Sequence, residues 1–287
     1  MPELPEVESI KRALEPKIKG KVIRKVAILS SKNFIGDETS VVGRKITNIN
    51  RFGKVLVIKL VNPLTRKPVN YLNIHFKLSG QMLYSKKVDN AIFANKIPFT
   101  KGKKMPANTT RVIISFSDGS GIFFNDLRKF GWIKVSKKPL SPKGVDVLSK
   151  NFTSKLLTDI TGKTRKPIKV LLMDQDLITG IGNIYANDSL FLARIHPQRP
   201  ANSLTANEIK KLHSAIISEI KKGVHDKGSS GADEAFILPD GSKGRHQRRF
   251  LVYQREGEKC PRCGHVIKRI KHNGRSSFLC QNCQVSA

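Results

Sequence analysis

Met1-Pro2-Glu3-Leu4-Pro5-Glu6-Val7-Glu8 opens the chain and leads into a short amphipathic segment. Pro5 suits the first turn of a helix, where its missing N–H would have no partner anyway. Val7, Ile10 and Leu14 share one helical face, so the spacing predicts a helix over residues 5–15. The opening is acidic and lacks an apolar stretch, so it does not have the pattern of a secretory signal.

Strand patterns replace the helical period after this segment, as far as about residue 135. β-Branched residues dominate several short runs, and Ser117–Ser120 resembles a hairpin turn between two of them. The predicted strands are Lys21–Leu29, Arg44–Asn50, Lys54–Leu60, Val112–Phe116 and Gly121–Phe124. Many short strands in succession predict a β-sandwich or barrel over residues 1–135. The lysine-rich stretch 86–108 is expected to be an exposed loop.

A linker is expected at 136–150, and helical periodicity follows it in a domain spanning 151–250. The predicted helices are Lys166–Asp176, Asn183–Arg194 and Glu208–Val224, and Thr205 with Glu208 forms a capping-box pattern before the last. Residues 226–250 are rich in glycine and show no clear period, which predicts a functional or disordered loop.

Cys260-Pro-Arg-Cys263 and Cys280-Gln-Asn-Cys283 define a last module, 251–287. Four thiolates at this spacing can surround one structural Zn²⁺, with a redox dithiol pair as the alternative. The module carries six basic residues and one acid between residues 258 and 287. We therefore expect a phosphate-contacting finger, while a finger used only for protein contacts remains the alternative.

The charge balance points to a polyanionic partner. Lysine and arginine number 53 against 22 acidic residues, a net charge of +31. Such a field attracts nucleic acid first and an anionic membrane second, unless the lysines serve only solubility. No apolar run reaches the length of a membrane span, so none is expected. The clustered cysteines favour a reducing, intracellular compartment: the cytoplasm or nucleoid, if the source is bacterial.

Pro2 has the chemistry of a nucleophile once Met1 is removed. An α-amino group titrates near 7.7–8.0, against about 10.4 for a lysine, so more of it is neutral at pH 7. A secondary amine that attacks a sugar C1′ gives an iminium without an N–H proton. That cation remains an electron sink, which favours elimination of a phosphate.

Six strings in order resemble the formamidopyrimidine-DNA glycosylase/endonuclease VIII family over nearly the whole chain. They are Met1–Glu8, Arg51–Lys54, His75–Gly80, Asn125–Gly131, Gly180–Ala186 and the cysteine module. Leu4 is closer to the formamidopyrimidine branch. The resemblance implies an α+β multidomain fold: an N-terminal β-sandwich with an N-terminal helix, a helical domain with a helix–two-turn–helix, and a C-terminal zinc-finger β-hairpin.

The resemblance also implies a bifunctional glycosylase and lyase that removes oxidised bases and cleaves the strand by β,δ-elimination. Pro2 would be the nucleophile, Glu3 a general acid or base, and Lys54 a catalytic and phosphate-binding residue. Arg275 would grip a phosphate and assist the second elimination. Without the family context, Glu3 and Glu6 would only favour the helix N-terminus, and Lys54 would face solvent.

Contacts to the DNA follow from the same resemblance. Leu78, Arg128 and Phe130 would fill the space left by a flipped nucleotide, although ordinary core packing is the alternative for the two apolar residues. Phosphate-contacting or other DNA-contacting positions are implied at Lys163, Asn183 and Asn108, and Asn183 also suits an N-cap.

Three positions depart from the family pattern: Asp188 stands for a glutamate, Lys77 for a glycine, and Asn108 lies near a usual histidine. They leave the preferred lesion open. It could be 8-oxoguanine and the formamidopyrimidines, or it could be oxidised pyrimidines. The expected partner is double-stranded damaged DNA, bound by a monomer. A non-catalytic, structure-specific DNA-binding protein is the alternative function.

Overall fold

A computed structural model describes residues 1–231, 236–272 and 274–285. The described residues form two compact units, one from Met1–Ser141 with Asp226–Gln247 and one from Pro142–His225 with Arg248–Ala287. The sequence led us to place 151–250 in one helical domain, whereas contacts assign 226–247 to the N-terminal unit. The reason is packing, because Phe236 and Leu238 are buried in that unit's core. Residues 232–235, part of the expected loop at 226–250 that would be the lid of the helical domain, lie outside the described residues.

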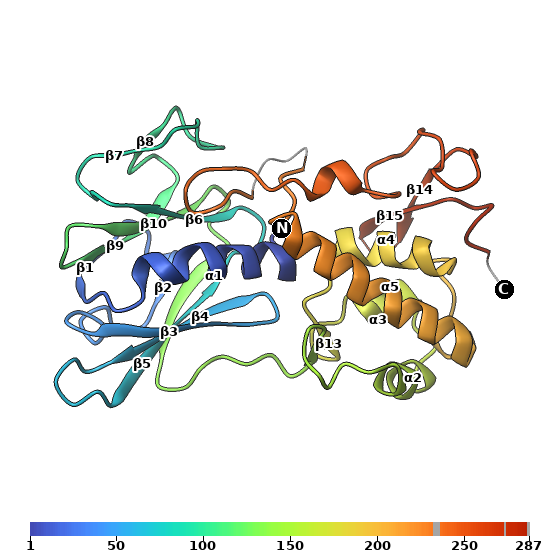
Figure 1. Cartoon of the computed structure of the whole chain (residues 1–287), viewed down its shortest axis with the longest axis horizontal. Helices are drawn as coiled ribbons and strands as arrows, with labels where there is room; N and C mark the ends of the chain where they lie inside the picture. Colours follow the sequence, from blue (N-terminus) through green and yellow to red (C-terminus); the bar gives the residue numbers. More distant parts are fainter. Residues whose placement is uncertain (232–235, 273, 286–287) are drawn as a thin grey trace. The chain divides into compact units, whose positions relative to one another are not determined.

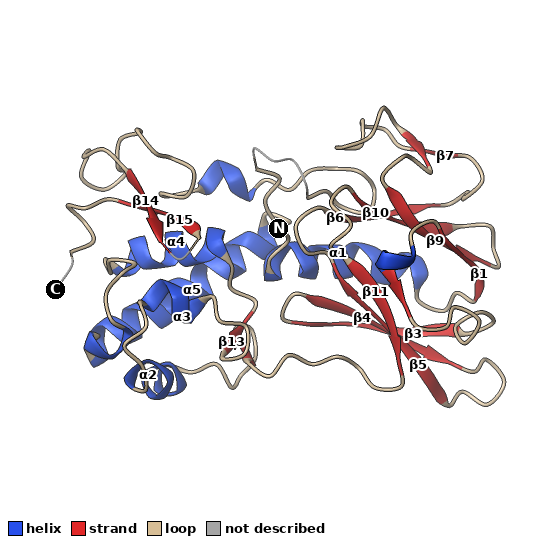
Figure 2. Ribbon diagram, turned by 180° about the vertical axis from the view of Figure 1, so that it is seen from behind, coloured by secondary structure: helices blue, strands red, loops and turns tan. Residues whose placement is uncertain are grey.

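Two large sheets and the helix α1 (Leu4–Ile18) build the core of the N-terminal unit (Figures 1 and 2). The first sheet has the order β1 (Ile23–Ile28), β9 (Thr110–Phe116), β10 (Gly121–Asp126), β6 (Gly80–Ser85). The second has the order β2 (Phe34–Ile35), β11 (Trp132–Ser136), β5 (Pro68–His75), β4 (Val55–Val61), β3 (Lys45–Phe52). All pairings in them are antiparallel except that of β2 with β11. A short 3₁₀ turn, η1 (Ser31–Asn33), precedes β2.

Apolar residues from both sheets and α1 share one buried core, as a sandwich requires. The predicted face of α1 is buried in it. The helix runs beyond the predicted end to Ile18, with Pro16 inside its last turn. Proline there removes only one hydrogen bond, and the complete burial of Ile18 favours continuing the helix past it.

Each of the five predicted strands is present, but β5, β6 and β11 were not predicted. In β5, buried asparagines interrupt the apolar alternation: Asn73 Nδ2 donates to Ser136 Oγ (2.7 Å) and its Oδ1 accepts from Leu140 N (2.8 Å). The expectation of an exposed loop at 86–108 is wrong for part of it. Strands β7 (Ala91–Ile92) and β8 (Lys104–Met105) pair there, and a second buried cluster forms around Phe93 and Ile97.

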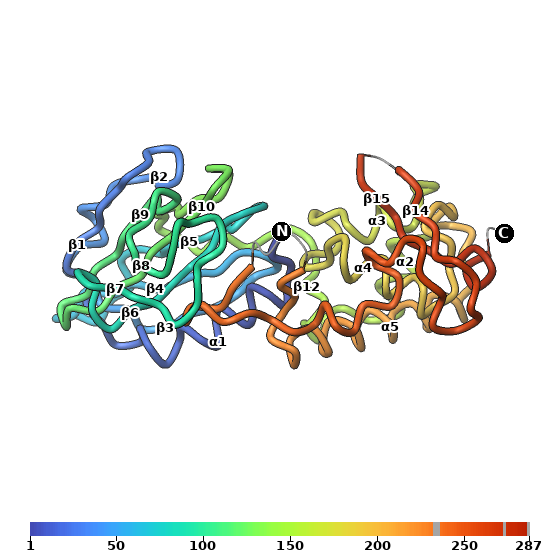
Figure 3. The backbone as a smooth tube through the Cα atoms, turned by 90° about the horizontal axis from the view of Figure 1, so that it is seen from above, coloured from blue at the N-terminus to red at the C-terminus, as the bar shows by residue number. Residues whose placement is uncertain are grey.

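The described residues of the segment 226–247 pack onto the N-terminal unit, and we call this segment the strap (Figure 3, orange). Pro239 O accepts a hydrogen bond from Tyr84 N of β6 (2.8 Å). Gly244 lies so close to Gly228 O that an added Cβ would stand 2.2 Å from it. Glycine at this position is what allows the two ends of the strap to pass each other.

Helices dominate the second unit. They are α2 (Ser154–Gly162), α3 (Ile168–Leu172), α4 (Asn183–Ala193) and α5 (Ala206–His225), with 3₁₀ turns η2 (Ala201–Ser203) and η3 (His246–Arg249), the latter beginning in the strap. Strands β12 (Val145–Asp146) and β13 (Ile178–Thr179) pair in parallel, and β14 (Lys268–His272) and β15 (Arg275–Leu279) form an antiparallel hairpin.

The predicted capping box of α5 is confirmed, since Thr205 N donates to Glu208 Oε2 (2.8 Å) and Glu208 N donates to Thr205 Oγ1 (3.3 Å). α2 was not predicted, and α3 is shorter than the predicted helix. No helix in the described part of the chain is long and apolar enough to cross a membrane.

Candidate functional site

Pro2 and Glu3 lie buried at the start of α1, with Glu3 only 2% exposed. Glu6 fixes this end: its Oε2 accepts from Glu3 N (2.9 Å) and its Oε1 accepts from Ser229 N (2.8 Å). The expectation that Glu6 serves only the helix N-terminus is therefore incomplete, because it also binds the strap. Gly228 makes this possible, since an added Cβ would stand 2.9 Å from Glu6 Cγ.

Lys54 is 5% exposed in the turn before β4, so the solvent-facing alternative is wrong. Arg51 shapes this turn. Its Nη1 donates to Gly53 O (2.9 Å), and its Nε donates to Glu8 Oε2 on α1 (3.0 Å). Despite burial, hydrogen bonds from Arg12 and Arg51 hold the pKa of Glu8 below its usual value. Arg51 thus links the helix that begins at the candidate nucleophile to the turn that carries Lys54.

His75 ends β5 as a neutral ring. Burial, with help from the charges of Lys77 and Lys54, lowers the pKa of His75 to about 4. Its Nδ1 accepts a hydrogen bond from Lys77 N (3.0 Å), which assigns the ring proton to Nε2. Lys77 itself has a left-handed φ of +50°, a conformation that glycine adopts without strain. Lys77 therefore adopts a backbone conformation that favours glycine, the residue that the family pattern has at this position.

Leu78 and Phe130 are 38% and 59% exposed, and Arg128 is exposed as well. Ordinary core packing is therefore excluded for the two apolar residues. Leu78 lies in the loop before β6 and Phe130 in the turn after β10. Both apolar side chains stand open to solvent on linked loops, a placement that suits insertion into another molecule.

A buried carboxylate, Asp126, joins these two loops. Its Oδ1 accepts from Ser79 Oγ and from Arg128 N (3.2 Å), and its Oδ2 accepts from Gly131 N (2.7 Å). Asn33 closes the network by donating to Gly131 O (2.6 Å). Asp126, Ser79 and Asn33 therefore hold the loop of Leu78 against the turn of Arg128 and Phe130. Sequence reasoning did not single out these three residues.

Asn108 is exposed near the same turn. Arg111 connects them, because its Nη1 donates to Asn108 O (3.1 Å) and its Nε donates to Asp126 O (2.8 Å). The N-terminal unit thus brings Leu78, Arg128, Phe130 and Asn108 onto linked loops.

In the second unit, Asn183 is half-buried at the first position of α4, and Gly182 is the N-cap in its place. Gly180 has a φ of +111°. Gln175 stabilises this glycine turn by accepting from Gly180 N (3.1 Å) and donating to Ile181 O (2.8 Å). The result is an amide-rich loop that leads into a helix N-terminus, an arrangement suited to phosphate.

Arg275 and Lys163 are exposed, Arg275 at the start of β15 and Lys163 at the C-cap of α2. The hairpin that carries Arg275 is anchored by buried polar groups. Lys169 Nζ donates to Ser277 Oγ (2.8 Å), and Phe278 N donates to Asn187 Oδ1 (2.8 Å).

Asp188 on α4 stands where the family pattern has a glutamate. It is 1% exposed. Its carboxylate accepts backbone N–H bonds from Leu251, Val252 and Tyr253, each 3.0 Å long. Burial raises the pKa of Asp188 to about 6 against these lowering hydrogen bonds. Asp188 therefore supports the segment that leads into the cysteine module.

The four cysteines fit one zinc ion. Their sulfur atoms all lie within 4.8 Å of one another. The Cys260–Cys283 and Cys263–Cys280 separations are 3.9 and 3.4 Å, whereas tetrahedral thiolates at about 2.3 Å from zinc stand about 3.8 Å apart. One Zn²⁺ held by these four residues would fix the turns on both sides of the β14–β15 hairpin.

Three family models match the chain. They are the formamidopyrimidine-DNA glycosylase N-terminal domain at residues 1–133, the formamidopyrimidine-DNA glycosylase H2TH domain at 143–234, and the zinc finger found in FPG and IleRS at 257–285. A formamidopyrimidine-DNA glycosylase from Pelotomaculum thermopropionicum is 36% identical over 296 residues, covering 99% of each chain.

Solved structures show the same similarity. The MutM (Fpg) protein of Thermus thermophilus is 30% identical, with a TM-score of 0.84 over 100% of both chains. A Lactococcus lactis Fpg mutant in complex with Fapy-dG-containing DNA is also 30% identical, with a TM-score of 0.82 over 99% of both chains.

Proposed function

Because the chain belongs to the formamidopyrimidine-DNA glycosylase family, we propose that it removes oxidised bases from double-stranded DNA and cleaves the strand at the same site. Formamidopyrimidines and 8-oxoguanine are the proposed lesions. The observation that carries this proposal is the buried Pro2–Glu3 terminus, at the head of a chain that is similar over its full length to these glycosylases. The relatives are bacterial, and we place its action on chromosomal DNA in the cytoplasm.

The reaction begins when the ring nitrogen of Pro2, freed of Met1, attacks C1′ of the damaged nucleotide. The bond from C1′ to the base breaks, and the base leaves with the proton that the Pro2 nitrogen gives up. Glu3 donates a proton to the sugar ring oxygen as the ring opens, which leaves an iminium between Pro2 and C1′. Loss of a C2′ proton then expels the 3′ phosphate. A second elimination, assisted by Arg275, expels the 5′ phosphate.

The DNA contacts are proposed separately for each unit. In the N-terminal unit, Lys54 binds a phosphate, and Leu78, Arg128 and Phe130 occupy the space of the extruded nucleotide. Their exposure on loops tied by Asp126 supports this role. In the second unit, Asn183, Lys163 and Arg275 contact phosphates, while one zinc ion holds the finger rigid.

Borohydride reduction during turnover tests the nucleophile. Mass spectrometry first checks that the purified protein lacks Met1. This protein should then become covalently linked to duplex DNA that contains 8-oxoguanine or an abasic site. Peptide mapping should locate the adduct on Pro2, and Pro2→Gly should reduce its yield at least tenfold. Pro5→Ala, a proline change in the first turn of α1, is the matched control and should retain the adduct.

Two results would overturn the proposal. An adduct mapped to a lysine would exclude Pro2 as the nucleophile. No adduct with any oxidised or abasic substrate, together with tight DNA binding, would favour a non-catalytic, structure-specific DNA-binding protein.

A further inference from the structure

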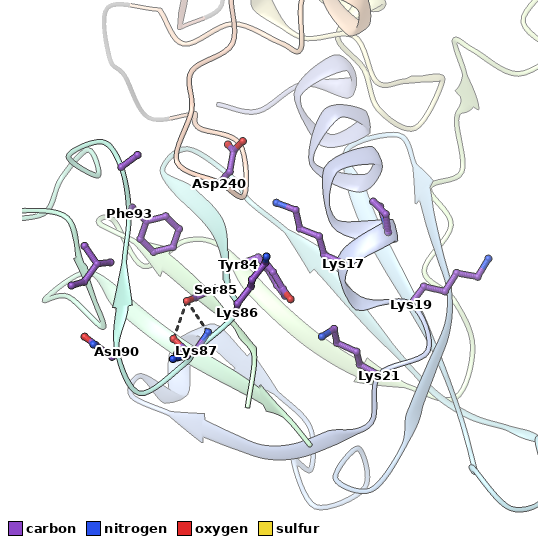
Figure 4. A pocket seen from close by; sticks show the side chains of 13 residues that line it. Lys17, Lys19, Lys21, Tyr84, Ser85, Lys86, Lys87, Asn90, Phe93 and Asp240 are labelled. Atoms are coloured by element: carbon purple, nitrogen blue, oxygen red, sulfur yellow. Dashed lines mark hydrogen bonds between the residues drawn. The ribbon is translucent and has the colours of Figure 1, made fainter. Parts of the chain in front are cut away.

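A lysine-lined pocket lies on the N-terminal unit at the C-terminal end of α1 (Figure 4). Its volume is about 800 Å³, within the range of about 300–1,000 Å³ that small-ligand pockets occupy. The charged residues in its lining are Lys17, Lys19, Lys21, Lys86, Lys87 and Asp240. Five ammonium groups against one carboxylate give this lining a formal charge of +4.

Contacts within the unit hold one of these lysine side chains and one turn of the lining in place. Lys21 Nζ bonds Asp118 and Ser120 Oγ (2.8 Å), and its side chain is only 20% exposed. Ser85 Oγ donates to Lys87 O (2.8 Å), which shapes the turn that presents Lys86 and Lys87 (Figure 4). The fold therefore positions Lys21 and the turn of Lys86 and Lys87, while the side chains of Lys19, Lys86 and Lys87 are exposed.

Tyr84 lies in the lining as well, but its ring is covered by cations. Lys17 Nζ and Lys21 Nζ stand 5.4 and 5.7 Å from the ring centroid. Phe93 is only 6% exposed. Phe93 is closed to stacking on a nucleobase and the Tyr84 ring already contacts two ammonium groups, so we expect a ligand here to be recognised by its charge.

Asp240 is the one carboxylate in this lining. Its Oδ1 accepts hydrogen bonds from Ser242 N (3.0 Å) and Ser242 Oγ (2.6 Å), which fix its place within the strap. The remaining wall presents ammonium groups, each a compact donor suited to phosphate oxygens.

We propose that this pocket binds a short chain of phosphate groups, either an inorganic tripolyphosphate or the triphosphate group of a nucleotide. Lysines from the end of α1, from the turn after it and from the end of β6 would surround the phosphates. The proposal is independent of the proposed repair function. Pro2 precedes the opposite end of α1, whose 15 residues span about 22 Å.

Calorimetry on the full chain at 0.15 M salt tests the pocket, with tripolyphosphate, ATP and adenosine as probes (the salt is set at about physiological ionic strength). Tripolyphosphate and ATP should bind with dissociation constants within about threefold, and adenosine should not bind. The combined change Lys17→Gln, Lys86→Gln, Lys87→Gln should weaken tripolyphosphate binding at least tenfold. The control Lys32→Gln, Lys45→Gln, Lys67→Gln removes the same charge from exposed sites and should weaken it less than twofold.

If both variants lose the same affinity for tripolyphosphate, the proposal is overturned, because the anion is then attracted by the overall positive charge and not by the pocket. Binding of adenosine, or much tighter binding of ATP than of tripolyphosphate, would overturn charge-only recognition. A single-stranded oligonucleotide that loses affinity in the pocket variant, while tripolyphosphate does not, would make the surface a nucleic-acid contact instead. Circular dichroism checks folding, and Lys86→Gln alone replaces the triple variant if that variant does not fold. Borohydride adduct yield should be the same in all these variants.

Discussion

Asp126 uses both of its carboxylate oxygens as hydrogen-bond acceptors, one on each side of the two loops it joins. An asparagine has the same size but one acceptor oxygen, so its NH₂ group must face either Gly131 N–H or the Ser79–Arg128 side. Asp126→Asn should lower the free energy of unfolding by about 1–3 kcal/mol, the cost of a buried unsatisfied group. Urea denaturation measures this loss.

The same substitution should weaken binding to duplex DNA with an abasic-site analogue at least tenfold, because the turn of Arg128 and Phe130 loses its anchor. Asp118→Asn, in an exposed hairpin turn, is the matched control and should leave this affinity within about twofold. Fluorescence anisotropy on folded protein gives the comparison. Unchanged affinity in the Asp126 variant would mean that the loops need no such anchor.

His75 predicts a pH dependence of stability. Its folded pKa of about 4 lies below the usual 6.5, so between these values the unfolded chain binds a proton that the folded chain does not. Stability is therefore intact above pH 6.5 and is lost as the pH falls toward 4, by at most about 3 kcal/mol.

The change His75→Asn, whose Oδ1 can still accept from Lys77 N, should flatten that part of the profile. The difference in unfolding free energy between wild type and variant, followed from pH 7.5 to 4, isolates this residue from the titrating carboxylates. If the unfolding free energies of wild type and variant change in parallel with pH, the dependence does not come from His75.

The zinc site was predictable because the spacing of four cysteines dictates it, and the four sulfur atoms do lie together, whereas the catalytic roles of Pro2 and Glu3 stay predictions. The roles of Asp126, Ser79 and Asn33 were not predictable, because polar residues that bond to distant backbone have no local pattern. Glu6 shows the limit most clearly. Its helix-capping role can be inferred from spacing, whereas its bond to Ser229 spans 223 residues.

At the scale of elements, the zinc-finger hairpin depends on its metal. Removing zinc frees four thiolates and should disorder β14–β15, since a short two-stranded hairpin is barely stable alone. DNA affinity should then fall at least tenfold, and added Zn²⁺ should restore it. Metal analysis paired with anisotropy measures both, and full affinity after verified zinc loss would rule out the finger as a DNA contact.

Elements with a strong period were predicted well, including α5 and the strands β4 and β9. Elements that owe their existence to partners were missed. The strand β5 contains Asn70 and Asn73 at buried positions, and the pair β7–β8 has only two residues in each strand. Such segments become strands because a neighbouring strand satisfies their backbone, and single-segment patterns carry no trace of that neighbour.

At the scale of the whole molecule, charge and motif order predicted the fold class and the family, whereas the course of the chain between the units was not predicted. A glycine-rich segment without a period has no local signal for the core it joins. Tertiary contacts determine which core the segment joins. Phe236 and Leu238 pack in the main sandwich core, and Ile237 packs in the neighbouring cluster.

This strap has a consequence for synthesis. The sandwich is assembled from two stretches of chain, with the whole helical bundle translated between them. A nascent polypeptide released at residue 141 would expose the apolar surface that Phe236 and Leu238 later cover. Completion of the first unit must therefore wait until translation has passed residue 247, by which time α2 to α5 have already been synthesised.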